Sequence, residues 1–480
     1  MVGRPEDLAE LVKELGKLRE EIAALRRETS ELRKGLADRD ETIAKLSAAL
    51  EAARRGGKRQ AAPFSKGEPK KAPKKPGRKK GKDHGPAERR MVPDRVDEVL
   101  EARLPRRCAC GGAVVEHGVQ HQFQTELPRI EPQVRQFNVH VGQCSRCGAR
   151  VQGRHPQQTS DALGAAASML GPRVVGLAAQ MHKELGVSFG KISKLFGSVF
   201  NIQVSRGGLS QAIYRLATRI DPTFEAMKEV LPTRPVISPD ETGWRVGGIS
   251  SWLWVFEAVD LIVYGIMPGR GFEDATEILP ANYGGKLARD GWSVYRKYEA
   301  ATHQTCIAHL LRRCSEIMEV AKAGAARVPR AVQRLLRRGL NLRDRRDRGE
   351  ISAKGLRVQV GKLTAAAERL LRWRPTDEEN RKLLGHVRGE HERGALFAFL
   401  EHPDLPATNH RAEQAIRPAV VNRKVCGGNR TWNGAFAQER LMSVLSTARR
   451  QGLDVLDLFA QALQATEPIV LPIRGLHTTS

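Results

Sequence analysis

The sequence has no run of about 18 or more uncharged apolar residues, which a membrane-spanning helix would need. Residues 1–30 carry charges throughout, so the basic and apolar regions of a secretory signal peptide are missing. Membrane insertion and secretion are therefore not expected. Aromatic residues make up only 5% of the chain, which argues against one large compact globule and for several modules joined by polar segments.

Acidic residues are in deficit as well. The 54 Asp and Glu stand against 80 Lys and Arg, a formal net charge of +26, so a polyanion is the expected partner and nucleic acid the leading candidate. Seven cysteines in 480 residues without a signal peptide do not indicate a disulfide framework. The length suggests about three domains at roughly 150 residues each, and a hydrophobic content of 40% suffices for a core.

Residues 1–53 carry a seven-residue repeat. Counted from Leu8 as position a, eleven of the thirteen a and d positions are apolar, with Glu, Lys and Arg on the flanks. This repeat predicts a coiled coil resembling a leucine zipper, and hence a homodimer or higher oligomer, with Thr29 and Arg39 as interruptions. A single amphipathic helix lying on the body of the chain is the alternative.

Residues 54–92 change abruptly in composition to Gly, Pro, Ala and Lys. From Arg54 to Lys82 there are thirteen basic residues and one acid, Glu68, a net charge of +12. So much charge with so few large apolar side chains predicts a flexible linker. Sequence-independent contact with DNA phosphates is its functional interpretation, and simple tethering is the alternative.

Residues 93–157 contain two cysteine pairs, each followed by glycine: Cys108 with Cys110, and Cys144 with Cys147. Between the pairs, residues from His121 to Val141 include short alternations of polar and apolar side chains, as in strands. The pattern predicts a zinc ribbon in which the four thiolates hold one structural Zn²⁺. Because the first pair has an unusually short spacer, two alternatives stay open: a metal-free module, or replacement of one ligand by His117, His121 or His140.

Residues 158–230 are expected to be helical and to bind DNA. Two apolar helices flank a break at residues 201–205, which fits a helix-turn-helix with Arg206 and Arg215 facing outward. Ordinary helical packing fits the pattern almost as well.

Beyond residue 231 the apolar pattern becomes strand-like. Residues 236–246 and 251–267 predict a meander in the middle of a sheet, followed by alternating helices and strands up to a long helix from Ala308. Together with the preceding segments, this order predicts a multidomain protein with a mixed sheet of α/β type.

Two aspartates, Asp240 and Asp290, stand at the ends of apolar strands, where side chains leave the core and converge on a cleft. Carboxylate oxygens are what Mg²⁺ prefers. Neighbours in a strand point to opposite faces, so Asp240 and Glu241 cannot both enter one site, and a third carboxylate is needed from elsewhere.

A helix beginning near Thr408 or Asn409 offers that carboxylate. Asn409, Glu413 and Arg417 are spaced by four residues and therefore line one stripe of the helix. An acid flanked by an amide and a guanidinium suits a metal ion beside a phosphate.

These segments carry a family resemblance. The blocks are Asp240-Glu-Thr, Asp290-Gly-Trp-Ser-Val-Tyr295, Cys306-Ile-Ala-His309-Leu-Leu-Arg-Arg313, Thr408-Asn-His-Arg-Ala-Glu413-Gln-Ala-Ile-Arg-Pro and Asn422-Arg-Lys424. They resemble the signature blocks of insertion sequence 66 family transposases of the TnpC type, over nearly the whole chain. The chain departs from the family pattern at the shortened first cysteine pair, at Trp292 and at His410-Arg411.

The resemblance implies a ribonuclease H-like catalytic domain over residues 231–442 with a helical insertion at about 315–405, followed by a C-terminal helix and tail, residues 443–480. It implies Asp240, Asp290 and Glu413 as a DDE triad. Two Mg²⁺ or Mn²⁺ ions would serve DNA strand cleavage and transfer, with Asp240 bridging them, Asp290 holding one and Glu413 the other. The side chains expected to contact DNA phosphates are His309, Arg313, Asn409, Arg417, Arg423, Lys424, Arg206 and Arg215.

The expected partner is double-stranded DNA, both the terminal inverted repeats and the target, with accessory proteins of the same element as further candidates. The expected location is the bacterial cytoplasm, in association with the nucleoid. Two other functions stay open: a non-catalytic DNA-binding regulator derived from a transposase, and a ribonuclease H-like nuclease acting on RNA or hybrids.

Overall fold

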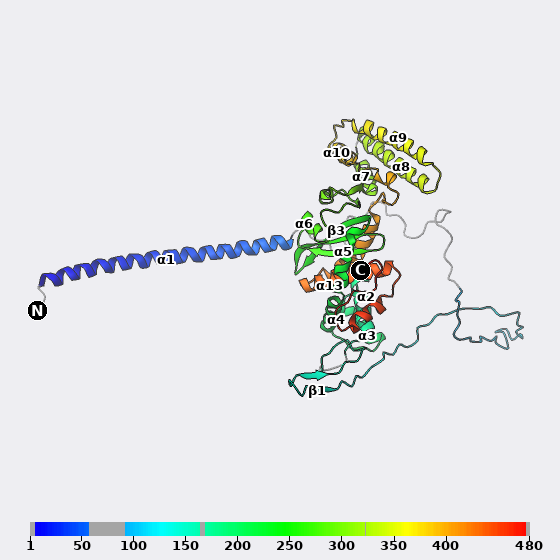
Figure 1. The fold of residues 1–480 in the computed structure, drawn as a ribbon, viewed down its shortest axis with the longest axis horizontal. Coiled ribbons are helices and arrows are strands. Elements are labelled where there is room, and N and C mark those ends of the chain that lie inside the picture. The colour runs from blue at the N-terminus through cyan, green and yellow to red at the C-terminus, as the bar shows by residue number, and fades with distance from the viewer. Residues whose placement is uncertain (1–4, 57–91, 164–168, 322, 477–480) are drawn as a thin grey trace.

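A long N-terminal helix and a body built around one mixed sheet make up most of the molecule (Figure 1). A computed structural model describes residues 5–56, 92–163, 169–321 and 323–476, without the side chains of residues 5–15, 47–56 and 323. The predicted linker, residues 54–92, lies almost wholly outside the described residues. In the described part of the chain, no helix has the length and apolar character needed to cross a membrane.

Helix α1 (Pro5–Gly56) covers the heptad repeat. All of its described side chains, residues 16–46, are exposed, and the apolar positions are no exception: Leu25 is 61% exposed and Leu32 63%. The apolar stripe predicted from the heptads is thus present, and within one chain it has no cover over these residues.

Residues 92–163 contain little regular structure. Strands β1 (Val141–Gln143) and β2 (Arg150–Gln152) form an antiparallel hairpin around the second cysteine pair. The prediction of strands between His121 and Val141 is wrong, because no residue before Val141 in this segment belongs to a strand. Val134 is 82% exposed, and Phe137 and Val139 are only partly buried, so the alternating apolar residues form no fully buried face, and burial is what normally makes such a pattern a strand.

Four helices occupy most of residues 172–230, as predicted: α2 (Pro172–Lys183), α3 (Phe189–Val199), α4 (Arg206–Arg219) and α5 (Asp221–Val230). The break between α3 and α4 contains Asn201 at φ 52°, a conformation that asparagine tolerates better than most residues. Ser205 caps α4 by accepting the Gly208 N–H at 3.0 Å. A short 3₁₀ turn, Leu231–Thr233, leads into the sheet.

The sheet has five strands in the order β5-β4-β3-β6-β7. They are β3 (Val236–Val246), β4 (Ile249–Glu257), β5 (Ile262–Met267), β6 (Lys286–Arg289) and β7 (Thr302–Thr305). The first three form the predicted antiparallel meander, and β6 and β7 add in parallel to β3. This mixed order is consistent with the ribonuclease H-like domain that the resemblance implies.

Helices cover both faces of the sheet. Around it lie α6 (Phe272–Thr276), the 3₁₀ turn η3 (Ser293–Lys297), α12 (His410–Cys426), α13 (Trp432–Arg450) and α14 (Val455–Gln464). Trp254 and Phe256 pack with the helices of residues 172–230 into the main core, whereas Trp244 and Leu253 pack with α12 on the opposite face. The alternation of side chains along β3 and β4 therefore decides what each residue contacts.

Residues between β7 and α12 form a helical unit with its own core, where the insertion was expected at about 315–405. Its elements are α7 (Ile307–Val320), η4 (Ala323–Ala326), α8 (Arg327–Asp347), α9 (Ala353–Leu371), α10 (Glu378–Glu392) and α11 (Ala398–Glu401). Helices α8, α9 and α10 lie at one end of the body, and α7 joins them to the sheet (Figure 1).

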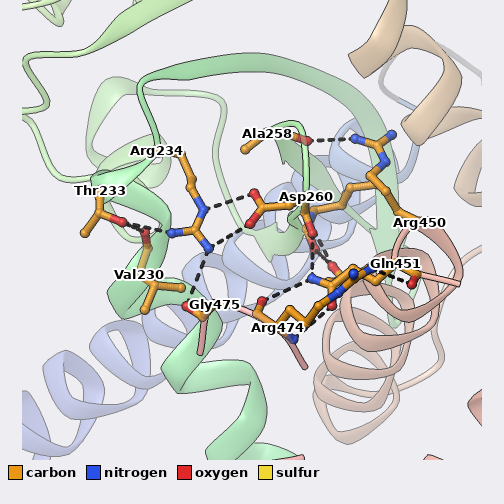
Figure 2. A network of polar contacts seen from close by, with 11 residues as sticks. Val230, Thr233, Arg234, Ala258, Asp260, Arg450, Gln451, Arg474 and Gly475 are labelled. Carbon is orange, nitrogen blue, oxygen red and sulfur yellow. Dashed lines mark hydrogen bonds and ion pairs between the residues drawn. The ribbon is translucent and has the colours of Figure 1, made fainter. Parts of the chain in front are cut away.

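A polar network ties the C-terminal segment to the sheet (Figure 2). Asp260, in the turn between β4 and β5, accepts hydrogen bonds from Arg234 Nε at 3.0 Å and Nη2 at 2.9 Å. Gln451, just beyond α13, donates to the Asp260 carbonyl at 3.0 Å and accepts the Arg474 N–H at 2.9 Å. The last described residues are thereby held against the same sheet edge.

Candidate active site

Asp240 and Asp290 are brought together by the register of two parallel strands. β3 and β6 pair Val236 with Lys286 and Ile237 with Leu287. Each aspartate lies three residues beyond the last of these pairs, so the parallel pairing brings both to the same level of the sheet. Asp290 directly follows the end of β6, as expected, whereas the expected strand end at Asp240 is wrong: Asp240 lies within β3, which continues to Val246 in its pairing with β4. Strand pairing thus places side by side two residues that are fifty positions apart in the sequence.

Glu413 joins them from the first turn of α12. Asn409, at the N-terminus of this helix, donates from Nδ2 to the carbonyl of Pro239 at 2.8 Å. That bond fixes the start of α12 against β3 directly beside Asp240. Asp240 and Trp244 lie on the face of β3 that α12 covers, so Glu413 and Asp240 face the same space.

The pKa of Asp240 is affected by the neighbouring acids. Burial, together with the charges of Glu241, Asp290 and Glu413, raises the pKa of the Asp240 carboxyl to about 7. Asp290 and Glu413 are therefore both close enough to Asp240 for their charges to oppose its ionisation.

Part of each carboxylate is left without a protein donor. Asp240 Oδ1 accepts the Glu241 N–H at 2.9 Å, and Asp290 Oδ1 accepts the Trp292 N–H at 2.8 Å. Glu413 Oε1 lies 3.5 Å from Nε2 of His309, and the Glu413 side chain is 29% exposed. Among the described residues, nothing donates to the second oxygen of any of the three. These oxygens remain available to an external cation.

Such a donor set fits Mg²⁺ in one particular way. No three His, Cys, Asp or Glu side chains of the described residues gather closely enough to hold a single ion. Mg²⁺ is commonly held by one or two carboxylates together with substrate phosphates and water. Two carboxylates for each ion, with Asp240 common to both ions, would need no group of three ligands and would match the way in which proteins usually hold Mg²⁺.

His309 borders the carboxylates from α7. A hydrogen bond with Cys306 and the charges of Cys306, Glu413 and Asp290 raise the pKa of its imidazole, against the opposing effect of burial. Cys306, at the start of α7, also receives the Asn409 N–H at 3.2 Å. His309 thus lies beside Glu413, with its Nε2 3.5 Å from Glu413 Oε1.

A cavity of about 610 Å³ opens next to His309, between α7 and α10. Arg312, Arg313 and Glu316 line one side and His386 the other, and Gly291, the neighbour of Asp290, lies at its edge. A Cβ on Gly291 would lie 2.7 Å from Cε1 of the His386 ring, so any larger residue at this position would have to displace that ring.

Two residues expected at DNA phosphates have internal contacts instead. Asn409 is 1% exposed and engaged with Pro239. Arg423 is half-buried and donates from Nη1 to Thr242 Oγ1 at 2.8 Å and to the Gly243 carbonyl. Both tie α12 to β3, which argues against direct contact with a phosphate. The helical stripe from Asn409 through Glu413 to Arg417 is real, but its first member faces the protein interior.

The other expected DNA contacts are accessible. Arg206 and Arg215 lie exposed on α4, and Arg417 and Lys424 lie exposed on α12. Arg313 is partly exposed at the cavity. The structure does not bring the α4 arginines to the carboxylate cluster.

The four cysteines predicted to bind zinc lie in two separate places, Cys108 near Cys110 and Cys144 near Cys147, and all four are free thiols. Hydrogen bonds within each pair lower the pKa of Cys108 and of Cys144. Because no three potential ligands gather in the described parts of the chain, the four thiols expected around one zinc ion do not form that site here. The unpaired segment between the two knuckles accounts for this, since it contains no strands to bring the pairs together.

Sequence reasoning missed a second layer around the aspartates. Glu241, whose side chain is 2% exposed, accepts from Arg270 Nε at 3.0 Å and from the Tyr295 hydroxyl. The Arg270 guanidinium lies 4.4 Å from the ring centroid of Trp252 and 3.6 Å from that of Trp292. Glu241 thus faces away from Asp240, as strand alternation predicts. The sequence feature that could have indicated these contacts is the pair of adjacent acids, since the second acid needs partners on the other face of the sheet.

A buried ion pair links the sheet to the helical unit. Arg289 and Glu390 are both fully buried, with Nη2 and Oε2 at 2.6 Å, and Arg296 reaches the other carboxylate oxygen at 2.9 Å. Arg289 also donates to the carbonyl of Asp290 at 2.9 Å. No local pattern marks Glu390, because its partner lies 101 positions away.

Comparison with known proteins agrees with the expected family. The IS66 family of transposases matches residues 167–437. Two uncharacterized proteins of Sinorhizobium fredii (strain NBRC 101917 / NGR234) are similar: y4qI, 26% identical over 306 residues, and y4jO, 25% identical over 99 residues.

The matched regions span 55% of this chain and 53% of y4qI, and 21% of this chain and 30% of y4jO, so about half or less of each relative is covered. The family match covers more than half of the chain and contains all three candidate carboxylates. The protein therefore belongs to the IS66 family of insertion-sequence transposases, a DDE family.

Proposed function

We propose that this protein binds the terminal inverted repeats of its insertion sequence and catalyses DNA strand cleavage and strand transfer, with Asp240, Asp290 and Glu413 as its DDE triad. The observation that carries the proposal is the convergence of three carboxylates from β3, the end of β6 and α12, each with an oxygen to which no described residue donates. Family membership implies transposition, and this cluster provides a place for its chemistry.

Two Mg²⁺ or Mn²⁺ ions held there would activate a water or a DNA 3′-hydroxyl and stabilise the leaving oxygen. Asp240, between the other two acids, would serve both ions, with Asp290 and Glu413 serving one each. The Glu241 and Trp292 amides hold one oxygen of each aspartate, which orients the other toward the ligand. His309 would donate a hydrogen bond to a phosphate oxygen near Glu413.

The proposed DNA contacts are the expected basic side chains that are exposed or partly exposed. We assign phosphate contacts to Arg313, Arg417 and Lys424 near the triad, and DNA binding to Arg206 and Arg215 on the α3–α4 unit, where a helix-turn-helix was expected. Asn409 and Arg423 become positioning residues for α12.

The proposed domain organisation is: coiled coil, residues 1–53; basic linker, 54–92; cysteine-containing module, 93–157; helical DNA-binding region, 158–230; ribonuclease H-like catalytic domain with its helical insertion, 231–442; and C-terminal helix and tail, 443–480. The last boundary has to move, because residues 442 and 443 both lie within α13, which packs against the sheet over its length. Self-association through α1 would supply two catalytic domains for two element ends.

Zinc in the cysteine module stays a prediction, since Cys108, Cys110, Cys144 and Cys147 would first have to come together. About one zinc per chain, lost in Cys144→Ser, is expected if they do. Purified protein that folds normally without zinc would reject it.

The decisive experiment is strand cleavage and transfer on DNA carrying the inverted repeats, with Mg²⁺ or Mn²⁺. Asp240→Asn should lower the rate by on the order of 10²–10³-fold or more while DNA binding persists. Glu299→Gln, which removes an exposed carboxylate, is the matched control. Chelation of divalent cations should abolish activity in the wild type.

The alternative functions predict different outcomes. If wild type and Asp240→Asn both bind the ends and neither nicks DNA, the protein is a non-catalytic regulator. Cleavage of RNA–DNA hybrids without any need for element ends would identify a ribonuclease H-like nuclease.

A further inference from the structure

The strongest feature that the proposed triad does not use is the charge on α8. This helix of 21 residues contains eight arginines, no lysine and two aspartates, Asp344 and Asp347. Its net charge of +6 is concentrated in a single element of the helical unit, far in sequence from the basic linker.

The arginines and the apolar residues of α8 occupy opposite faces. Val332, Leu336 and Leu342 are buried in the core of the helical unit. Four arginines in the middle of the helix are exposed: Arg330, Arg334, Arg337 and Arg338. Their spacings of three and four residues place them on one face, which we call the α8 basic face.

Among the residues that the structure describes, no acidic side chain pairs with the α8 basic face. Arg343, Arg346 and Arg348 near the C-terminal end each bond a neighbouring carboxylate. In contrast, no hydrogen bond, ion pair or ring contact joins the four side chains of the α8 basic face to any other described residue. Their donors are therefore free for an external partner.

This arrangement works against the helix itself. Arg330 and Arg334 are four residues apart, as are Arg334 and Arg338, and like charges at that spacing destabilise a helix. Solubility alone would be served by mixed charges, as on α10, where Lys382 pairs with Glu378 and Glu379. A bound polyanion would relieve the repulsion on α8.

We propose that the α8 basic face binds the phosphate backbone of duplex DNA while the triad acts on that DNA. The inference rests on the proposed function. Arg330 and Arg338 are eight residues apart, which spans about 12 Å along the helix, close to the width of the DNA major groove and the separation of the phosphates at its edges. Arginine also matches phosphate oxygens with two parallel N–H donors, which lysine does not.

The position of α8 agrees with this role. α8 packs against α7, the helix that carries His309 and Arg313, within one shared core. DNA held at the triad and leaving past the cavity between α7 and α10 would have the helical unit as its neighbour. The insertion would thus extend the DNA-binding surface beyond the site of chemistry.

The test compares two triple variants of the full chain with equal loss of charge. Arg330→Gln, Arg334→Gln and Arg337→Gln together remove most of the α8 basic face. Lys354→Gln, Arg357→Gln and Lys362→Gln together remove three exposed charges from α9 and serve as the control. The probe is a DNA duplex carrying one end of the element and its flanking sequence, and affinity is measured as a function of salt concentration.

The slope of log affinity against log salt should become less steep by about 2.7 in the α8 variant, at roughly 0.9 for each phosphate that the variant no longer neutralises, and change little in the control. An unchanged slope in the α8 variant, or an equal change in both, would overturn the proposal. So would a structured RNA or an acidic polypeptide that binds wild type more tightly than the DNA and loses that affinity in the α8 variant.

Cleavage by the wild type in the same preparations separates the two proposals. Suppose that the wild type cleaves the element end and that the salt slope of the α8 variant equals that of the wild type or of the control. Only the α8 inference then fails. If the wild type shows no cleavage under any divalent cation, the proposed function fails whatever the slopes show.

Discussion

At the scale of single residues, orientation of side chains matters more than their identity. Asp240 and Glu241 are neighbours, yet Asp240 joins the carboxylate cluster, whereas Glu241 forms an ion pair with Arg270 and accepts a hydrogen bond from the Tyr295 hydroxyl on the opposite face. The same chemical group thus serves two purposes because the strand alternates.

Asn409 provides a residue-scale prediction. Asn409→Ala removes the bond to the Pro239 carbonyl and should lower the rate of strand cleavage by about tenfold or more through misplacement of Glu413, with little change in DNA affinity. Single-turnover cleavage measured alongside DNA binding checks this. An equal fall in affinity would instead indicate that Asn409 contacts a phosphate.

Lys183 provides a second prediction at this scale, on stability. It lies buried at the end of α2, 3% exposed, and its Nζ donates to Gln438 Oε1 at 2.7 Å. Burial lowers the pKa of its ammonium group to about 8, against a partial opposing effect of Cys426. The neighbouring His182 is also kept uncharged, because burial lowers its pKa to about 3.

Between pH 8 and the unfolded value of about 10.4, the unfolded chain binds the Lys183 proton and the folded chain does not, so stability should rise with pH by about 3 kcal/mol. Lys183→Met should remove this rise. It should also increase the free energy of unfolding at pH 7 by about 1–3 kcal/mol, because it removes a buried charge. Lys194→Met, at an exposed position on α3, is the control. Denaturant unfolding across this pH range tests the prediction, and a rise retained in Lys183→Met would contradict it.

At the scale of elements, the buried pair of Arg289 and Glu390 couples the helical unit to the strand end that carries Asp290. Burial alone would raise the pKa of Glu390, but the guanidinium groups of Arg289 and Arg296 hold it below its ordinary value. The carboxylate is therefore charged at neutral pH, and its stabilising contribution is present above the unfolded pKa and lost as the pH falls through the folded one.

Glu390→Gln should destabilise the fold by about 3–5 kcal/mol, because it leaves the Arg289 charge buried without its counter-ion. Glu392→Gln, at an exposed position near the end of the same helix, should change stability by less than about 0.5 kcal/mol. Thermal or denaturant unfolding of both variants provides the measurement. Equal stability of the two would show that α10 is not held through this pair.

At the scale of the whole molecule, α1 bears an apolar stripe that one chain leaves exposed over residues 16–46. Burial of such a stripe against a second copy is the proposed basis of self-association. Leu25→Glu with Leu32→Glu, both at d positions, should therefore reduce the mass in solution to that of one chain.

Ala23→Glu with Ser30→Glu, at b positions of the same heptads, adds the same charge outside the stripe and should leave the mass unchanged. Light scattering on the full chain distinguishes the two pairs of variants. Self-association that survives the d-position changes would mean that the oligomer forms through another surface.

The sequence by itself determined the features that depend on local pattern. The heptads predicted α1, the strand-like apolar segments predicted the meander of β3 to β5, and the spacing in the α12 segment predicted a helix beginning near Thr408 or Asn409, where α12 begins at His410. Residue blocks also identified the family, and the three carboxylates that they contain are those proposed as its triad.

Only the tertiary structure decided which side chains are buried and what they contact. Asn409 and Arg423 turned inward, the segment before Val141 formed no strand, and Arg289 found Glu390 across 101 positions. Local sequence cannot settle such outcomes, because burial and ion pairing depend on which distant segment covers a face, and that is fixed only when the sheet and helices pack.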